Sequence, residues 1–540
     1  MVCRSHGRSR SVHVFKRTIC RRTMAALASI SLLGGCGLLS GGGSQTQQEI
    51  TVGTTSEPST LDPAASWDGS WELYRNVFQT LVAFPTGSTA PQPDAAQSCQ
   101  FQDKSSRTFT CTLRKGMTFS DGTKLDASAV KYSIDRIVKI NVKAGPKGLL
   151  SSLDQVTADN DLTVTFHLNK PDATFPYVLG APAMSIVDPR AYPADKLRDD
   201  GGLTGSGPYT LQSYKAGDRA VLKKNDHYQG FAQPKNDGVT IRYFRDSGAM
   251  VDALKNKQID VTYRGITADE VEDIRNEKAA GKPLQLVENT GTEIRFLVFN
   301  PKDPQAANPA VRRAVAQLVD RDALVAKVYK GTAEPLYSMV PTGVNGHTTS
   351  FFDAFGSPSV PKAKDILRKA GVTAPVPLQL WYTTDRYGSS MEAEFKELKR
   401  QLDASGLFDV TLNSRPWKTY TEGFQAGDFP VFGRGWFPDF PDPDNFIAPF
   451  VGKENAVGTP YEPREITTQL IPQSREVSDR GAVSKQFERA QDILVDDVRL
   501  LPLWQGKLYI AASDDIAGGE RAMDPQTVMQ LWELHRKTSW

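Results

Sequence analysis

The segment "GWFPDFPDPDN", residues 435–445, sets three aspartates among prolines and aromatic residues: Asp439, Asp442 and Asp444. Carboxylates at this spacing could form the acid and base of a hydrolase, bind a hard cation, or bind a cationic group of a ligand. A hydrolase is a distant alternative, because the chain has no G-x-S-x-G, H-E-x-x-H or P-loop motif. The spacing also lacks the glycine and the distal glutamate of an EF-hand. We therefore predict neither a catalytic residue nor a metal site here.

A structural role is the other interpretation of these aspartates, since aspartate beside proline usually caps a turn or a helix. Asp442 precedes Pro443 and is predicted to stabilise a turn. Asp444 precedes the segment "NFIAPF" and is predicted to be a helix N-cap. Asp439 is the aspartate for which ligand binding has to be weighed against a structural role.

Composition predicts a large globular protein. The chain has 540 residues, 39% of them hydrophobic, which suggests at least two lobes. The formal net charge is +2, but residues 1–35 contain seven basic and no acidic residues. Without them, 57 basic and 62 acidic residues remain, a net charge of −5. This mildly acidic body gives no reason to expect nucleic-acid binding.

Residues 1–35 are predicted to be a signal peptide. A basic region precedes a mostly apolar run, residues 24–33, which is too short to span a bilayer. The next residues, "LGGC", resemble a bacterial lipobox, which implies that Cys36 is acylated and becomes the mature N-terminus. The alternative is a plain secretory signal with an incidental cysteine. Residues 36–48 would then be the lipid anchor and a flexible tether, because their glycine, serine and glutamine content favours a random coil.

Two cysteines remain in the body, Cys99 and Cys111. The apolar residues of "SCQFQDKSSRTFTCTLRKG" lie symmetrically about Ser105, so a hairpin turning there places Cys99 opposite Cys111 and Phe101 opposite Phe109. We predict a disulfide, which an oxidising compartment favours; the alternative is a pair of buried thiols. A C-x-x-C motif is absent and the six histidines are scattered, so no zinc site and no cofactor are expected.

Several elements must position these residues. Residues 49–55 are predicted to form a strand, residues 70–81 a helix, and residues 99–168 mainly hairpins with a helical insert after Asp126. A second helical zone follows Pro309, in which Asp320 can cap a helix and Gly331 can end it. The runs 294–300 and 501–512 are apolar and strand-like.

Five segments together resemble a known family, the large solute-binding proteins of ABC importers, in the class of the dipeptide- and oligopeptide-binding lipoproteins. They occur in the family's order. The segments are "SEPSTLDP" (56–63), "LRKGMTFSDGTKLDASAVKYSIDRI" (113–137), "GSGPYTLQSYKAGDRAVLKKNDHYQG" (205–230), the "FNP…VRRAVAQLVDRDALVAKVYKGTAEP" stretch (299–335) and "GWFPDFPDPDNF" (435–446).

The resemblance implies an α/β, two-lobed periplasmic-binding-protein-like fold, type II, of the large class with an extra subdomain. Lobe I would comprise residues 49–295 plus 505–540, with an inserted subdomain at about 90–200, and lobe II residues 296–504. The two crossings, near 294–300 and 501–512, would form a hinge. Closure would be driven by ligand contacts made with both lobes only in the closed form.

The resemblance also implies a function: a binding protein, not an enzyme, that captures peptides and delivers them to an ABC transporter permease. In peptide-binding members the aspartate three residues after a tryptophan accepts the ligand's α-ammonium, and Trp436 and Asp439 keep this spacing. Arg434 is a candidate for the ligand's carboxylate. The alternative ligands are a sugar, a nickel complex or an opine, because the fold does not fix the function. A carboxylate such as Asp439 would be wasted on a neutral sugar, and the few histidines argue against nickel.

The expected location is the extracytoplasmic face of the cell membrane, with Cys36 as lipid anchor. The expected partners are a peptide ligand, the membrane permease subunits of the transporter and the membrane itself. We expect the protein to be a monomer.

Overall fold

The computed structural model describes residues 49–65, 70–143, 145–388 and 390–537. The predicted signal peptide, Cys36 and the tether lie outside the described residues. We keep the names lobe I for residues 49–295 plus 505–537 and lobe II for residues 296–504.

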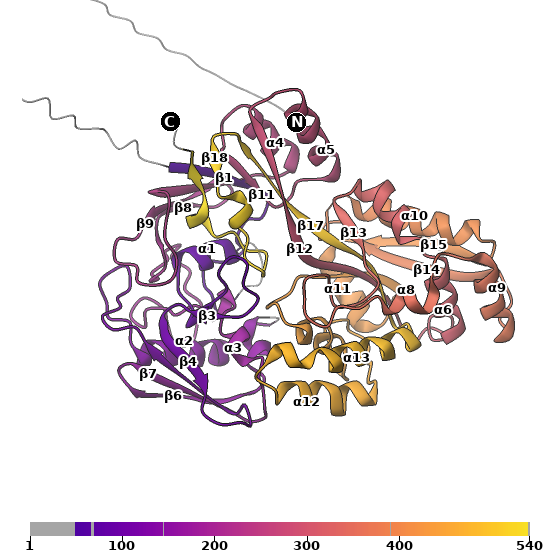
Figure 1. The fold of residues 1–540 in the computed structure, drawn as a ribbon, viewed down its shortest axis with the longest axis horizontal. Coiled ribbons are helices and arrows are strands. Elements are labelled where there is room, and N and C mark those ends of the chain that lie inside the picture. Colours follow the sequence, from indigo (N-terminus) through magenta and orange to yellow (C-terminus); the bar gives the residue numbers. More distant parts are fainter. Residues whose placement is uncertain (1–48, 66–69, 144, 389, 538–540) are drawn as a thin grey trace, which may run out of the picture. The chain divides into compact units, whose positions relative to one another are not determined.

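One mixed sheet of eleven strands runs through both lobes (Figure 1). Its strand order is β15-β14-β16-β12-β17-β11-β1-β10-β9-β8, and β13 pairs with β17. The two strands shared by the lobes are β12 (Leu284–Phe299) and β17 (Leu500–Ser513), which pair antiparallel along most of their length. They contain the two runs that were predicted to be strand-like, so that prediction is confirmed.

Lobe I is built on the parallel strands β11, β1 and β10, which the antiparallel strands β9 and β8 extend. Short paired strands lie beside this sheet. The elements are β1 (Glu49–Thr54), α1 (Ser70–Val77), β2 (Val82–Ala83), β3 (Gln92–Pro93), β8 (Tyr209–Lys215), β9 (Arg219–Lys224), β10 (Gly238–Tyr243), α4 (Ser247–Lys255), β11 (Val261–Tyr263), α5 (Ala268–Ala279), β18 (Ile516–Ala517) and β19 (His535–Arg536).

A separate four-stranded antiparallel sheet lies within the chain segment of the predicted subdomain, in the order β4-β5-β7-β6. The elements of this segment are β4 (Ala96–Phe101), β5 (Thr108–Leu113), α2 (Ala127–Ile140), β6 (Leu153–Asn160), β7 (Thr163–Leu168) and α3 (Phe175–Val178).

Lobe II places helices around the parallel strands β15, β14 and β16. Its elements are α6 (Pro309–Leu318), α7 (Arg321–Leu324), β13 (Ala333–Pro335), α8 (Ser350–Phe355), α9 (Val360–Lys369), β14 (Val376–Thr383), α10 (Ser390–Ala404), β15 (Phe408–Arg415), α11 (Trp417–Ala426), β16 (Val431–Trp436), the 3-10 turn η4 (Pro443–Phe446), α12 (Ile471–Arg475) and α13 (Ser484–Asp497).

The β4–β5 hairpin confirms the predicted register. Cys99 lies opposite Cys111 and Phe101 opposite Phe109. A disulfide joins the two cysteines, and the two phenylalanine rings pack at 4.9 Å between their centres. The alternative of two buried thiols is therefore excluded.

The predicted helix after Asp126 and the predicted cap at Asp320 are also confirmed. The Asp126 carboxylate accepts hydrogen bonds from the Ser128 and Ala129 amides at the start of α2, at 3.0 and 3.1 Å. Asp320 accepts from the Ala323 amide at 2.8 Å and begins α7. Aspartate satisfies backbone donors that the first turn of a helix leaves without partners.

Helix α1 is shorter than the predicted 70–81. It ends at Val77, whose carbonyl accepts a hydrogen bond from the Gly207 amide at 2.8 Å. The chain at Gly207 approaches so closely that a Cβ there would lie 2.6 Å from the Val77 carbonyl carbon. The Gly207 amide, 130 residues further along the chain, therefore occupies the Val77 carbonyl, which the next turn of the helix would use as a hydrogen-bond acceptor.

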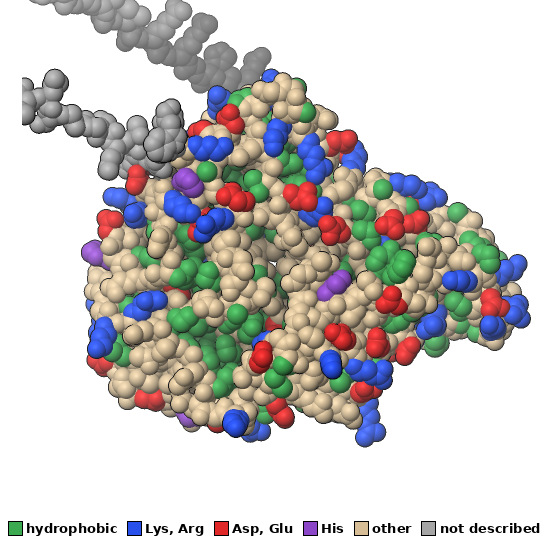
Figure 2. Space-filling view, in the orientation of Figure 1, with side chains coloured by type: hydrophobic (Ala, Val, Ile, Leu, Met, Phe, Trp, Pro, Cys, Tyr) green, Lys and Arg blue, Asp and Glu red, His purple; other side chains and the backbone are tan. Residues whose placement is uncertain are grey.

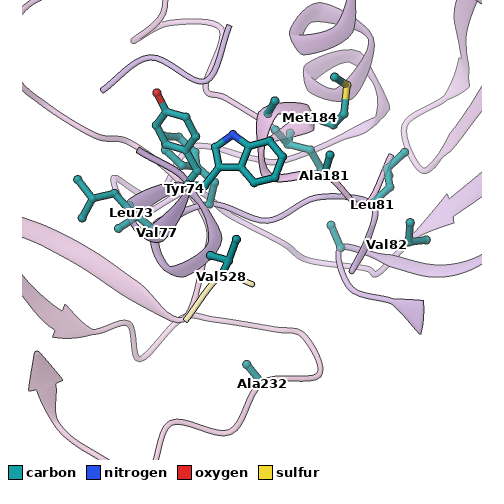
Figure 3. Close-up of a cluster of buried hydrophobic side chains, with 14 of the residues drawn as sticks. Leu73, Tyr74, Val77, Leu81, Val82, Ala181, Met184, Ala232 and Val528 are labelled. Carbon is teal, nitrogen blue, oxygen red and sulfur yellow. The ribbon is translucent and has the colours of Figure 1, made fainter. Parts of the chain in front are cut away.

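All of α1 is buried, and residues far apart in the sequence pack around it. Figure 3 shows this cluster, in which the labelled side chains are Leu73, Tyr74, Val77, Leu81, Val82, Ala181, Met184, Ala232 and Val528. The C-terminal segment thus contributes to the core of lobe I. Two further clusters fill lobe II, and a fourth lies beneath α4 and α5.

On the face shown in Figure 2, Lys and Arg side chains alternate with Asp and Glu. No extended field of one sign covers this face. Within the described residues, no helix is long and apolar enough to cross a membrane.

Candidate ligand-binding site

Strand β16 leads into the aspartate loop, which we define as residues 437–446. In this loop Asp442 is buried and begins the turn η4, where its carboxylate accepts a hydrogen bond from the Asp444 amide at 2.9 Å. The same carboxylate receives two hydrogen bonds from Arg480, at 2.7 and 2.8 Å. The predicted role of Asp442 in a turn is confirmed. Asp442 also forms a buried ion pair with Arg480.

Asp444 is not the N-cap that its position suggested. It lies inside η4, and Asp442 is the cap. Its side chain forms a two-pronged ion pair with Arg475, at 2.8 and 2.7 Å. Asp444 is therefore structural through a partner 31 residues away, which no local pattern could indicate.

Asp439 has a different environment, because the described chain gives it no cationic partner. Its carboxylate accepts a hydrogen bond from the Asn445 amide group at 3.0 Å, and its backbone N–H donates to Asn445 Oδ1 at 2.9 Å. Trp436 Nε1 donates to that same oxygen at 3.1 Å. Asn445 thus links Trp436 and Asp439, the two residues whose spacing the sequence analysis singled out.

The carboxyl group of Asp439 has an unusual protonation equilibrium. Burial raises its pKa to about 6, and the hydrogen bond from Asn445 opposes this rise only in part. The residue keeps partial contact with solvent. A carboxylate that is short of water and lacks a cation is a group that a ligand's cation can stabilise.

Arg434 lies apart from this group. Its side chain is buried, its guanidinium stacks on Phe424 at 4.3 Å, and Nη2 donates to the Ala456 carbonyl at 2.8 Å. Neither Arg434 nor Asp439 lines the large cavity described next; Phe437, from the same loop as Asp439, does. The structure therefore brings Trp436 and Asp439 together, and places Arg434 elsewhere.

A cavity of about 650 Å³ is lined by both lobes. On the side of lobe I its walls follow the carboxyl ends of β1, β10 and β11, including Thr55, Arg245 and Arg264. Ligands of α/β sheets commonly bind beyond the carboxyl ends of parallel strands.

Lobe II and the crossing strands supply the rest of the wall. The segment after β14 contributes Asp385, Arg386 and Tyr387, and the aspartate loop contributes Phe437. From β12 the cavity receives Arg295, whose guanidinium lies 4.0 Å from the Tyr387 ring centre. A volume of this size lies in the range that suits small-molecule ligands.

Sequence reasoning missed the cationic residues of this cavity. Five of its lining residues carry positive charge: Arg245, Arg264, Arg295, Arg386 and Lys507. Arg245, Arg264 and Arg386 each follow the end of a strand closely in sequence. Only the order of the strands in the sheet brings residues 245 and 386 to one cavity. No group of three or more metal-ligating side chains occurs in the described part of the chain.

Comparison with known proteins identifies the family. Residues 90–458 match the model of "Bacterial extracellular solute-binding proteins, family 5 Middle". The chain is 26% identical over 487 residues to the probable D,D-dipeptide-binding periplasmic protein DdpA of Escherichia coli K12, covering 87% of this chain and 90% of the relative. It is 25% identical over 491 residues to the glutathione-binding protein GsiB of Salmonella paratyphi A, covering 87% and 91%.

Solved structures share the fold. DppA from Helicobacter pylori, in complex with the peptide STSA, has a TM-score of 0.75 at 22% identity, covering 91% of this chain and 99% of that one. The dipeptide-binding protein of Pseudoalteromonas sp. SM9913, in complex with Met-Leu, has a TM-score of 0.77 at 18% identity, covering 91% and 100%. The two-lobed periplasmic-binding-protein fold is thus confirmed. The matched segment exceeds half of the chain, and the protein belongs to family 5 of the bacterial extracellular solute-binding proteins.

Proposed function

We propose that this protein captures peptides outside the cytoplasm and delivers them to the membrane permease of an ABC importer. The observation that carries the proposal is Asp439, a carboxylate without a cationic partner beside Trp436. A free peptide brings an α-ammonium, which forms a charge-assisted hydrogen bond with such a carboxylate. The names of the relatives DdpA and GsiB, which bind a D,D-dipeptide and glutathione, support this ligand class.

The ligand's carboxylate needs a cation, and we propose Arg386 in place of Arg434. Arg386 lines the cavity, is exposed and has no ion-pair partner in the described chain, although it stacks on Trp417. Arg434 is buried between the rings of Trp417 and Phe424. A free peptide would then be held at both of its charged ends. A neutral sugar would use neither charge, which makes it the weaker alternative.

The proposal is tested by calorimetric titration of the purified body with short peptides and their N-acetylated counterparts. Acetylation removes the ammonium and leaves the rest of the peptide unchanged. We expect acetylated peptides to bind at least about 30-fold more weakly, since removal of one partner of a largely desolvated charge pair costs about 2–5 kcal/mol. Equal affinities would contradict the role of Asp439, and mass spectrometry of ligand retained during purification would then identify another solute.

We further propose that Cys36 anchors the protein to the membrane after removal of residues 1–35. Acyl chains supply most of the membrane affinity of such a protein. The variant Cys36→Ser should therefore appear in the medium or in the soluble extracytoplasmic fraction. Unchanged membrane association of this variant would contradict the lipid anchor.

A further inference from the structure

Five cationic residues and three acidic ones, Asp246, Glu293 and Asp385, line the cavity. Each of the three acids has a partner within the protein, but only Glu293 is paired with a cation. Glu293 pairs with Arg295, Asp246 accepts a hydrogen bond from the Ala249 amide at 2.8 Å, and Asp385 accepts one from the Trp417 amide at 2.6 Å.

Two more of the cations are also neutralised inside the protein. Arg264 pairs with Glu72 at 3.2 Å. Lys507 pairs with Glu288 at 2.7 Å and with Glu334 at 3.4 Å. With Arg295 paired as well, Arg245 and Arg386 are the cavity cations that form no ion pair with any described residue.

These two arginines belong to opposite lobes. Arg245 follows β10 in lobe I, and Arg386 follows β14 in lobe II. Both are exposed, so neither is held by the protein core. An uncompensated arginine on the wall of a binding cavity favours an anionic group of the ligand, which its planar guanidinium can bind with two hydrogen bonds.

The surroundings of Arg245 strengthen this preference. Helix α4 begins at Ser247 and helix α5 at Ala268, and both residues line the same cavity. The N-terminal ends of helices carry partial positive charge. The two helix ends therefore add partial positive charge beside Arg245, and the capping carboxylates of Asp246 and Glu270 offset part of it.

We propose that the cavity selects acidic peptides, and that Arg245 binds the carboxylate of an aspartate or glutamate side chain of the ligand. This inference rests on the proposed peptide-binding function, in which Arg386 takes the terminal carboxylate. A peptide has one terminal carboxylate, so the second arginine without an ion pair is available for a second anionic group of the ligand. A ligand with both groups contacts both lobes through charge, and such contacts favour the closed form.

The test compares peptides that differ by a single charge. We would titrate the protein with Ala-Glu-Ala and Ala-Gln-Ala, and with Ala-Ala-Glu and Ala-Ala-Gln, which keep shape and length. We expect the glutamate peptide of at least one pair to bind about tenfold or more tightly, the usual strength of a hydrogen bond to a charged group. Added salt should reduce the preference, because exposed charges are screened.

The variant Arg245→Gln should lose the preference and bind the glutamine peptides as the parent does. Arg245→Lys should keep part of it, because the charge remains but the planar fork does not. Arg219→Gln is the matched control: it removes an arginine of lobe I that is exposed and does not line the cavity. This control should keep the full preference.

The outcomes separate the two proposals. Binding of both peptides of each pair with equal affinity would overturn the selectivity and leave the peptide-binding function intact. A preference that survives in Arg245→Gln would overturn the role of Arg245. Failure of every peptide to bind the parent protein would overturn the proposed function itself.

Discussion

The aspartate loop contains two regions that look alike in sequence and differ in chemistry. At its C-terminal end, Asp442 and Asp444 are each neutralised by an arginine, Arg480 and Arg475. At its N-terminal end, the Asp439 carboxylate accepts a hydrogen bond from the neutral amide of Asn445 and has no cationic partner among the described residues. The same residue type is thus a fixed structural element at one end and an unsatisfied charge at the other.

The difference shows how one loop can be held by fixed ion pairs and still present a carboxylate without a cationic partner. The two ion pairs hold the loop to the segment around α12, 31 to 38 residues further along the chain. Asn445 also holds Asp439 in place, because the Asn445 side chain forms hydrogen bonds with the Asp439 backbone, the Asp439 carboxylate and Trp436. A preorganised carboxylate loses little entropy when a ligand arrives.

The largest effect is expected on stability, at the end of the loop where the aspartates are paired with arginines. Asp442→Asn leaves the Arg480 guanidinium buried without a charge partner, and breaking a buried pair on one side costs about 3–5 kcal/mol. We expect a loss of this size in the free energy of unfolding, measured by urea denaturation. Peptide affinity of the folded fraction should stay within a few-fold. A stability loss below about 1 kcal/mol would contradict the structural role.

The next effect concerns the unpaired end. Asp439→Asn keeps the shape but removes the charge, and it should lower the affinity for free peptides by about 30-fold to several thousand-fold, equivalent to about 2–5 kcal/mol. Affinity for N-acetylated peptides should barely change. The measurement is calorimetric titration at pH 7.5. An equal loss for both kinds of peptide would point to damage of the loop rather than to a lost ammonium contact.

Asp439→Asn should lower the affinity for peptides but raise the stability of the ligand-free protein. Burial raises the pKa of Asp439 from 3.8 to about 6, so the ionised form destabilises the folded protein above pH 6. That cost is relieved as the pH falls through 6 towards 4. Since one pKa unit corresponds to about 1.4 kcal/mol and the residue is partly exposed, we expect Asp439→Asn to be about 1–3 kcal/mol more stable than the parent at pH 7.5.

Most of this gain should be lost by about pH 4, where the carboxyl group of the folded parent is protonated and that of the unfolded parent, with a pKa of 3.8, is about half protonated. Ligand-free protein must be used, because a bound ammonium stabilises the ionised carboxylate. Denaturation of the variant and the parent at pH 7.5 and pH 4 decides the point. A variant less stable than the parent at both pH values would show that Asp439 is structural like its neighbours.

The smallest effect is the pH dependence of binding by the parent. Ammonium binding needs the ionised carboxylate, so protonation competes with the ligand below pH 6. Between pH 7.5 and pH 5 we expect affinity for free peptides to fall about tenfold, since about nine-tenths of a group with a pKa near 6 is protonated at pH 5. Asp439→Asn should lack this dependence. A pH-independent affinity in the parent would contradict the assignment.

Local patterns predicted much of the fold. The alternation around Ser105 predicted the register of the disulfide hairpin, and Asp126 and Asp320 marked two helix starts, because such signals depend on residues a few positions apart. The end of α1 could not be predicted, since Gly207 approaches it from a distant segment.

Contacts between segments that are distant in sequence also limited the prediction of the site. The spacing of Trp436 and Asp439 indicated the aspartate loop as a candidate site, but no pattern indicated Asn445, which joins these two residues. Arg434 was chosen for its proximity in sequence, but Asp439 lies beyond the end of β16, where the alternation of a strand no longer relates the directions of two side chains. Arg245 and Arg386 could be recognised only once the sheet had brought both of them to one cavity.

The ladder between β12 and β17 is interrupted where it passes from one lobe to the other. The pairing shifts between Thr290 and Ile294, and Gly291 approaches the Gly506 carbonyl so closely that a Cβ would lie 2.3 Å from it. The Gln505 side chain donates to the Gly291 carbonyl at 2.7 Å in this gap. Between Thr290 and Ile294, β12 has no backbone pairing with β17 that bending of β12 would disturb, although β17 itself pairs with β13 at Gly506. Amide hydrogen exchange should therefore show a narrow window of fast exchange at 291–293, flanked on both sides by slowly exchanging strand.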